Sequence, residues 1–185
     1  TVAATDSYRL AERRVNLAKP VASFRRIVPH RSLAELQRML PPEGDVTFAF
    51  MENQLQVTVD DRELVSRLID GNFPDYQQII PKKPVTTTIV NRTSLIDAVR
   101  LASFFARDSA NHVKVAVTDT QLTLSAVSAQ LGTSQSTITV DSTGEALEIA
   151  YNAKFLLDVL QVLTGETVSL EFSGPVAPTL VTDAT

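Results

Sequence analysis

The sequence lacks cysteine, so disulfide bonds and cysteine-ligated metal sites are excluded. No apolar run approaches the roughly 18 to 20 residues that are needed to span a bilayer. Histidine occurs only twice, and no Ser-His-Asp order, HExxH motif, P-loop or glycine-rich phosphate loop is present. The adjacent Asp60 and Asp61 are typical of a turn rather than of a metal site. We therefore expect no enzymatic activity, no bound metal and no cofactor.

The chain has a small excess of acidic side chains, with 21 Asp and Glu against 17 Lys and Arg and a formal net charge of −4. A protein that grips nucleic acid over its whole surface is normally basic, so this composition argues against that class. A local basic face on an acidic body is compatible with the same balance. The position of the cations along the chain is therefore more informative than their number.

A short pattern occurs three times, at residues 28–36, 90–98 and 151–159. Each copy reads as an apolar strand, then Pro or Asn, then an amphipathic helix. A Leu follows the Pro or Asn by four residues, and a carboxylate follows it by six. These anchor residues, spaced by 62 and 61 residues, are Pro29, Asn91 and Asn152. Similarity at a fixed period usually means that one supersecondary unit is repeated and that neighbouring units bury a shared core.

Each repeated helix is followed by segments in which apolar and polar residues alternate with period two, which is typical of half-buried antiparallel strands. These segments are 46–50 and 55–59 after the first helix, 113–117 and 122–126 after the second, and 168–172 after the third. Each unit therefore reads as strand, helix and then antiparallel strands. The pattern predicts an α+β fold in which an amphipathic helix packs on one face of each antiparallel sheet.

Three prolines, Pro74, Pro81 and Pro84, lie within eleven residues and cannot continue a helix or a central strand. We interpret this segment as a linker and expect two domains, at residues 1–83 and 84–185. One copy of the repeat precedes the linker and two follow it, so we expect the first domain to lack half of its structure. The chain also begins without Met on residues with a strand-like pattern, and we interpret it as part of a longer protein.

Each repeated helix shows an apolar stripe with cationic side chains roughly opposite to it. The expected stripes are Leu33, Leu36 and Leu40, then Leu95, Val99, Ala102 and Ala106, and finally Leu156, Val159, Leu160 and Leu163. The cations on the outer faces are Arg31 and Arg38, then Arg100 and Arg107, and finally Lys154. Such a face is either an ordinary solvated surface or a surface that meets an anionic partner. The pattern alone does not choose between the two.

An aromatic residue interrupts the polar side of the second helix. Phe104 projects about 180° from the stripe that begins at Leu95, and Phe105 lies beside it on the flank. A large aromatic side chain in such a place either folds under a loop or belongs to a partner surface.

Four motifs in the chain resemble one family of proteins. Residues 4–11 read Ala-Thr-Asp-Ser-Tyr-Arg-Leu-Ala, and residues 68–76 read Leu-Ile-Asp-Gly-Asn-Phe-Pro-Asp-Tyr. Residues 151–158 (Tyr-Asn-Ala-Lys-Phe-Leu-Leu-Asp) and 175–178 (Pro-Val-Ala-Pro) follow in the order that the family shows. With these motifs the chain resembles, over essentially its whole length, the DNA polymerase III beta subunit of bacteria, the replicative sliding clamp.

The resemblance implies a ring of two subunits that encircles duplex DNA, slides on it and acts as the processivity factor of the replicative polymerase. Each subunit of that family has three domains of two repeated units, with the helices lining the hole and the sheets forming the outer wall. This chain would supply the second half of the middle domain and most of the third domain. The implied protein is a cytoplasmic homodimer and a non-catalytic accessory subunit of the DNA polymerase holoenzyme.

The resemblance places the cationic helix faces against DNA, where a clamp needs attraction to phosphate without readout of bases. The implied DNA-facing residues are His30, Arg31, Arg38, Arg100, Arg107 and Lys154. It also places Phe104 and Phe105 where the third domain meets the first domain of the other subunit. Without that domain, we expect these two residues to form an exposed surface that promotes self-association.

The family also captures short linear peptides from polymerase, clamp-loader and repair proteins, in an apolar groove between the middle and third domains. Carried over by motif, the groove residues are Thr5, Ser7, Tyr8, Arg9, Leu10, Pro74, Gln78, Ile79, Asn152, Phe155, Val176 and Pro178. Apolar walls suit Leu or Phe anchors of a peptide, and Arg9 and Asn152 can hydrogen-bond its backbone. Gln78 is often Arg in the family, and the usual C-terminal extension after Thr185 is missing. We therefore expect weakened peptide binding.

The alternative function is that of a repeat scaffold, which binds proteins without encircling DNA. The two functions differ in one observable property. A topological clamp that is loaded on circular DNA slides off when the DNA is cut, whereas a scaffold never loads.

Overall fold

Two units make up the fold in the computed structural model, which describes residues 1–17 and 21–184. The first unit comprises Thr1–Thr5 and Leu10–Asp75, and the second comprises Asp6–Arg9 and Tyr76–Thr185. Among the described residues, no helix combines the length and the hydropathy that crossing a membrane requires.

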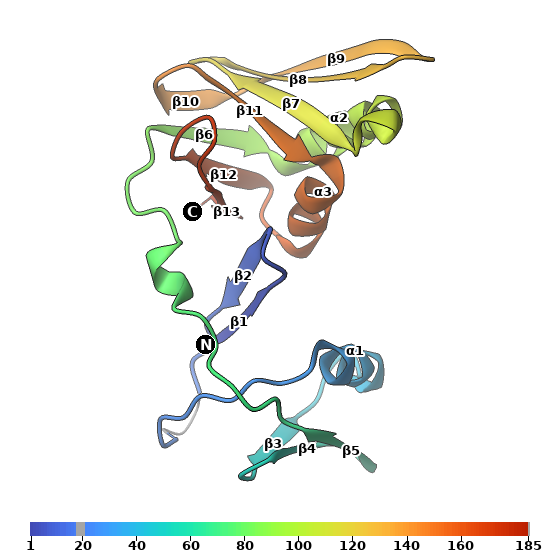
Figure 1. Cartoon of the computed structure of the whole chain (residues 1–185), viewed down its shortest axis with the longest axis vertical. Coiled ribbons are helices and arrows are strands. Elements are labelled where there is room, and N and C mark those ends of the chain that lie inside the picture. The colour runs from blue at the N-terminus through green and yellow to red at the C-terminus, as the bar shows by residue number, and fades with distance from the viewer. Residues whose placement is uncertain (18–20, 185) are drawn as a thin grey trace. The chain divides into compact units, whose positions relative to one another are not determined.

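The second unit contains, within its described part, two antiparallel sheets of four strands each (Figure 1). Its strands are β6 (Thr86–Asn91), β7 (His112–Val117), β8 (Gln121–Ser128), β9 (Gly132–Thr139), β10 (Asp141–Gly144), β11 (Leu147–Asn152), β12 (Thr167–Phe172) and β13 (Thr179–Asp183). One sheet has the order β10-β6-β12-β13, and the other has the order β11-β7-β8-β9. Because β6 pairs with β12 and β11 pairs with β7, the first strand of each repeat lies in the sheet of the other repeat. The two repeats are therefore interlocked.

Two α-helices of this unit, α2 (Arg92–Phe105) and α3 (Ala153–Val162), lie side by side (Figure 1). Each begins directly after the first strand of its repeat and is capped by the Asn that anchors the repeated pattern. The side-chain oxygen of Asn91 accepts a hydrogen bond from the backbone N–H of Ser94 at 2.9 Å, and that of Asn152 accepts one from Lys154 at 2.9 Å. These bonds satisfy N–H groups that a helix start otherwise leaves unpaired.

The first unit is smaller. A hairpin is formed by β1 (Val2–Thr5) and β2 (Leu10–Arg13), and a sheet of order β3-β4-β5 follows helix α1. The bounds of these later elements are His30–Met39 for α1, Val46–Phe50 for β3, Gln54–Val59 for β4 and Arg62–Arg67 for β5. Short 3-10 turns, which belong to the second unit, occur at η1 (Tyr76–Gln78) and η2 (Arg107–Ser109).

The predicted α+β class is confirmed, and the five segments with period-two alternation are all strands. The prediction of a strand before the first helix is wrong. The later helices follow the strands β6 and β11, whereas only a single bridge in the described part of the chain, between Ile27 and Ile69, precedes the first helix. Pro29 also provides no side-chain cap. A strand needs a partner that satisfies its backbone groups, and among the described residues only Ile69 pairs with this segment.

The core of the second unit confirms the apolar stripe of α2, since Leu95, Val99, Ala102 and Ala106 are all buried. The α3 stripe is confirmed in part, with Leu156 and Leu160 buried and its other members half-buried. In the first unit, the buried core is Leu36, Leu55, Val57 and Val59. The expected stripe residues Leu33 and Leu40 are instead exposed, because α1 packs on a sheet too small to cover them.

The two sheets of the second unit are linked by a polar contact. The hydroxyl of Tyr151, near the end of β11, shares a hydrogen bond with the hydroxyl of Thr179 at the start of β13. Burial raises the pKa of Tyr151 to about 12, and the bond to Thr179 opposes this rise only in part. The phenol therefore stays protonated at neutral pH.

Candidate functional site

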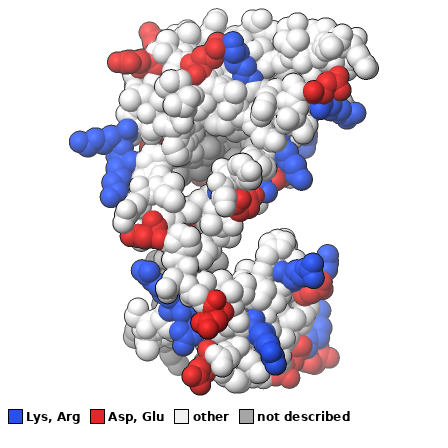
Figure 2. Space-filling model, in the orientation of Figure 1, with Lys and Arg blue, Asp and Glu red and all other residues white. Residues whose placement is uncertain are grey.

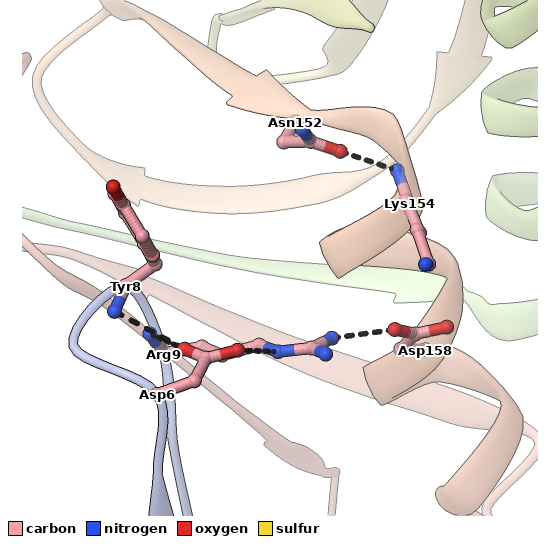
Figure 3. A network of polar contacts seen from close by, with 6 residues as sticks. All are labelled: Asp6, Tyr8, Arg9, Asn152, Lys154 and Asp158. Carbon is pink, nitrogen blue, oxygen red and sulfur yellow. Dashed lines mark hydrogen bonds and ion pairs between the residues drawn. The ribbon is translucent and has the colours of Figure 1, made fainter.

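The motif at residues 6–9 forms a tight turn that belongs to the second unit. Its first side chain, Asp6, accepts hydrogen bonds through Oδ1 from the backbone N–H groups of Tyr8 and Arg9, both at 3.1 Å (Figure 3). Ser7 adopts a left-handed backbone conformation, with φ of 74°. An Asp that hydrogen-bonds the backbone two and three residues later is a local turn former, which explains the conformation of this tip.

Arg9 connects the turn to helix α3. Its Nε donates to Asp6 Oδ2 at 2.9 Å, and its Nη1 donates to Asp158 Oδ2 at 2.5 Å (Figure 3). The guanidinium carbon also lies 4.5 Å from the centre of the Phe155 ring. The bond from Arg9 lowers the pKa of Asp6, and the bond to Asp158 raises the pKa of Arg9. Arg9 is thus held by two carboxylates and one ring.

Two further predicted groove residues lie at the same place. Tyr8 is 84% exposed, and its ring centre lies 6.2 Å from that of Phe155. Asn152 uses its side-chain oxygen to cap α3, and its amide nitrogen donates to the carbonyl of Ala110 at 3.4 Å. The expectation that Asn152 serves a peptide backbone therefore competes with its role in starting the helix.

A second group of predicted residues lines a pocket of about 450 Å³. Its walls are Gln78, Ile79, Ile80, Pro81, Lys82, Lys83, Ser173 and Pro178. Three of these, Gln78, Ile79 and Pro178, were predicted from the motifs. The other five, Ile80, Pro81, Lys82, Lys83 and Ser173, were missed, although the adjacent Lys82 and Lys83 could have been noticed between the prolines. The pocket is lined by apolar side chains together with two lysines, and apolar walls suit the apolar anchors of a peptide.

Of the remaining groove residues, only Ser7 belongs to one of these two groups. Thr5 and Leu10 are paired with each other at the ends of β1 and β2, in the first unit. Pro74 also belongs to the first unit, and Val176 is exposed in a turn of the second. Ser7 lies in the turn that contains Tyr8 and Arg9.

All of the predicted DNA-facing side chains are exposed. His30, Arg31 and Arg38 lie on α1, Arg100 lies on α2 and Lys154 lies on α3. The placement of Arg107 on the second helix is wrong, because α2 ends at Phe105 and Arg107 begins the 3-10 turn η2. Figure 2 shows basic and acidic side chains interspersed on the visible face of the molecule.

Two of these cations have carboxylate partners. Arg38 pairs with Glu35 on α1, and Arg100 pairs with Asp97 on α2 at 3.8 Å. Exposed pairs of this kind weaken the positive field without removing it. Phe104 is 53% exposed with the Arg107 guanidinium 5.0 Å from its ring centre, whereas Phe105 packs partly against the core.

No group of three or more His, Asp or Glu side chains within the described part of the chain is arranged to hold a metal ion. A hollow of about 800 Å³ in the first unit has Arg25, Arg26 and Arg67 among its walls, together with Glu52 and Asp70. None of the predicted site residues lines it.

Comparison with known proteins assigns both parts of the chain. Residues 1–75 match the family described as the DNA polymerase III beta subunit, central domain, and residues 77–185 match its C-terminal domain. The chain is 34% identical to the beta sliding clamp of Bacillus subtilis over 183 residues, which is 96% of this chain and 48% of that protein. It is 31% identical to the beta sliding clamp of Staphylococcus aureus over 178 residues, which is 95% of this chain and 47% of that protein. The chain thus spans about half the length of these relatives.

Solved structures agree with this assignment. The DNA polymerase sliding clamp of Bacillus subtilis superposes with a TM-score of 0.94 at 32% identity, over 99% of this chain and 50% of that one. The sliding clamp of Bartonella birtlesii, solved with bound griselimycin, superposes with a TM-score of 0.81 at 31% identity, over 86% of this chain and 44% of that one. With both of its parts matched in order, the chain belongs to the DNA polymerase III beta subunit family.

Proposed function

We propose that this chain is part of a sliding clamp, a ring that encircles duplex DNA and serves as the processivity factor of a bacterial replicative polymerase. The observation that carries the proposal is the consecutive match of residues 1–75 and 77–185 to the central and C-terminal domains of one polymerase subunit. The domain division that we propose, 1–83 and 84–185, assigns the proline-rich linker to the first domain. The protein works in the bacterial cytoplasm as a non-catalytic, homodimeric accessory subunit.

The proposed DNA-facing surface is formed by the exposed cations of the three helices. His30, Arg31 and Lys154 are exposed there, and two arginines of the same set carry carboxylate neighbours. A clamp that slides must be attracted to phosphates in general and must not bind one position tightly. Partly neutralised cations on an acidic protein support such weak and mobile attraction.

The proposed peptide site consists of the turn at residues 6–9 with α3, together with the pocket that contains Ile79 and Pro178. Its partners are short linear peptides of polymerase, clamp-loader and repair proteins. Tyr8, Phe155 and the apolar pocket walls offer the surfaces that Leu or Phe anchors require. The clamps of Bartonella birtlesii and Pseudomonas aeruginosa bind griselimycin, and we extend this ligand to the present chain.

Loading on circular DNA tests the ring. The chain, extended to the length of its relatives, is expected to remain on nicked circular DNA after loading by a clamp loader and to be released when the circle is cut once. Gel filtration of the DNA-bound fraction measures this. Retention on the cut DNA contradicts the ring, and failure to load at all favours the alternative of a repeat scaffold that binds proteins without encircling DNA.

The proposed subunit interface is tested by Phe104→Asp in the 185-residue chain. Because an exposed aromatic ring at the end of α2 favours self-association, the substitution is expected to lower the weight-average mass in sedimentation equilibrium. Val162→Asp is the matched control, since Val162 is 75% exposed at the end of α3 and the charge change is the same. Equal masses for the parent and Phe104→Asp would count against the interface. Phe105 is unsuitable for this test because it packs on the core.

A further inference from the structure

The three repeated carboxylates differ in the partner that each one finds. Glu35 on α1 pairs with Arg38, and Asp97 on α2 pairs with Arg100, in both cases three residues later on the same helix. Such i,i+3 pairs are local helix contacts. The equivalent carboxylate of α3 is Asp158, and the residue three positions later is Gln161, which carries no charge. Asp158 instead pairs with Arg9, which is 149 residues away in the sequence.

We propose that Asp158 is a positioning residue of the peptide site. Through Arg9, it fixes the turn at residues 6–9 against α3, so that Tyr8 and Phe155 present one aromatic surface to a peptide. This inference rests on the proposed peptide-binding function. It adds to that function a residue that touches no peptide itself and acts by holding another side chain.

The arrangement of α3 suits this role. Phe155 and Asp158 are three residues apart, so they lie on the same face of the helix. The Phe155 ring therefore lies under the guanidinium of Arg9, with its centre 4.5 Å from the guanidinium carbon. The carboxylate of Asp158 accepts a hydrogen bond from Nη1 of Arg9 at 2.5 Å. The remaining edge of the same guanidinium is bound by Asp6 through Nε (Figure 3). A planar arginine fork can satisfy two carboxylates in different directions at once, which a lysine cannot do with fixed geometry.

The bond from Arg9 to Asp158 joins the turn to the helix (Figure 3). The bonds of Asp6 lie within the turn and fix its shape. The ring contact between Tyr8 and Phe155 is tilted by 35° at 6.2 Å, and Tyr8 is otherwise exposed, so this contact alone fixes little. Holding a binding surface in its bound geometry raises affinity by reducing the cost of ordering it.

The test measures griselimycin binding to the 185-residue chain by isothermal titration calorimetry. Asp158→Asn is expected to bind about three- to fivefold more weakly than the parent, in the upper part of the roughly 1.4- to 5-fold range that loss of one exposed ion pair allows. Asp158→Glu keeps the carboxylate and is expected to stay within about twofold of the parent. Asp97→Asn is the matched control, because it removes the equivalent carboxylate of α2 with the same charge change, and it is expected to leave the affinity unchanged.

A second measurement does not depend on any ligand. In ¹⁵N NMR spectra, rotation about the Cζ–Nη1 bond of Arg9 is expected to be restricted in the parent and in Asp97→Asn, and to become fast in Asp158→Asn, because Nη1 is the atom that donates to Asp158. Unchanged rotation about the Arg9 Cζ–Nη1 bond in Asp158→Asn, or equal griselimycin affinity of Asp158→Asn and the parent, overturns the positioning role while leaving the proposed function intact. Failure of the parent to bind griselimycin contradicts the proposed site itself, and the positioning role with it. Loss of affinity in Asp158→Asn with recovery in Asp158→Glu supports the inference.

Discussion

Replacing Phe172 by alanine is expected to lower the free energy of unfolding of the second unit by about 3 to 5 kcal/mol, the range for large aromatic side chains removed from a packed core. Phe172 is fully buried and ends β12, between β6 and β13. Its carbonyl also accepts a hydrogen bond from Val85 at 2.7 Å. The cavity left by the ring would therefore lie where two strand pairings and the incoming linker meet.

Urea unfolding followed by tyrosine fluorescence measures this effect, because Tyr8, Tyr76 and Tyr151 all belong to the second unit. Phe104→Ala is the control. It removes the same side chain from an exposed position and is expected to change stability by less than about 1 kcal/mol. Similar unfolding midpoints for the two variants would contradict the assignment of Phe172 to the core.

The fold could be predicted from the sequence wherever the signal was local. Period-two alternation identified β3, β4, β7, β8 and β12, and the stripe from Leu95 to Ala106 identified the buried face of α2. The wrong predictions concern features that depend on another element of the structure, either one that pairs with a strand or one that covers a helix. A strand before Pro29 requires a pairing partner, and burial of Leu33 and Leu40 requires a sheet wide enough to cover them. A single sequence does not specify either.

The candidate site was predictable to a similar extent. The motifs selected Tyr8, Arg9 and Phe155, which the structure brings together. They did not select Asp158, which the sequence presented only as one of three carboxylates beside cationic helix faces. The missing signal is the pairing of Arg9 with Asp158 across 149 residues, which no periodicity encodes. The sequence does contain one hint, since Gln161 leaves Asp158 without the local arginine that the other two copies have.

Arg92 is a second residue whose long-range contacts could not be predicted from the sequence. It lies at the junction of α2 and α3, two of the helices proposed to face DNA. In the sequence it is merely the first residue after the Asn91 cap. In the structure its Nε donates to the carbonyl of Gly165 at 2.8 Å and its Nη1 donates to that of Leu160 at 3.1 Å. The last carbonyls of a helix have no partner within the helix, so the bond to Leu160 satisfies the end of α3 from the start of α2, and the bond to Gly165 binds the segment that follows α3. Arg92 thereby fixes the relative position of two helices from different repeats.

Arg92→Met is therefore expected to cost about 3 kcal/mol, because two charge-assisted hydrogen bonds are lost and two partly buried carbonyls are left unsatisfied. Methionine keeps most of the length and apolar packing of the side chain, so the loss reports mainly on the hydrogen bonds. Arg100→Met is the matched control on the same helix. Arg100 is exposed and its pair with Asp97 is long, at 3.8 Å, so a cost below about 1 kcal/mol is expected. The same tyrosine-detected urea unfolding measures both variants. If Arg92→Met were as stable as Arg100→Met, the end of α3 would have to be satisfied by other groups, and the helix pair would be held by apolar packing alone.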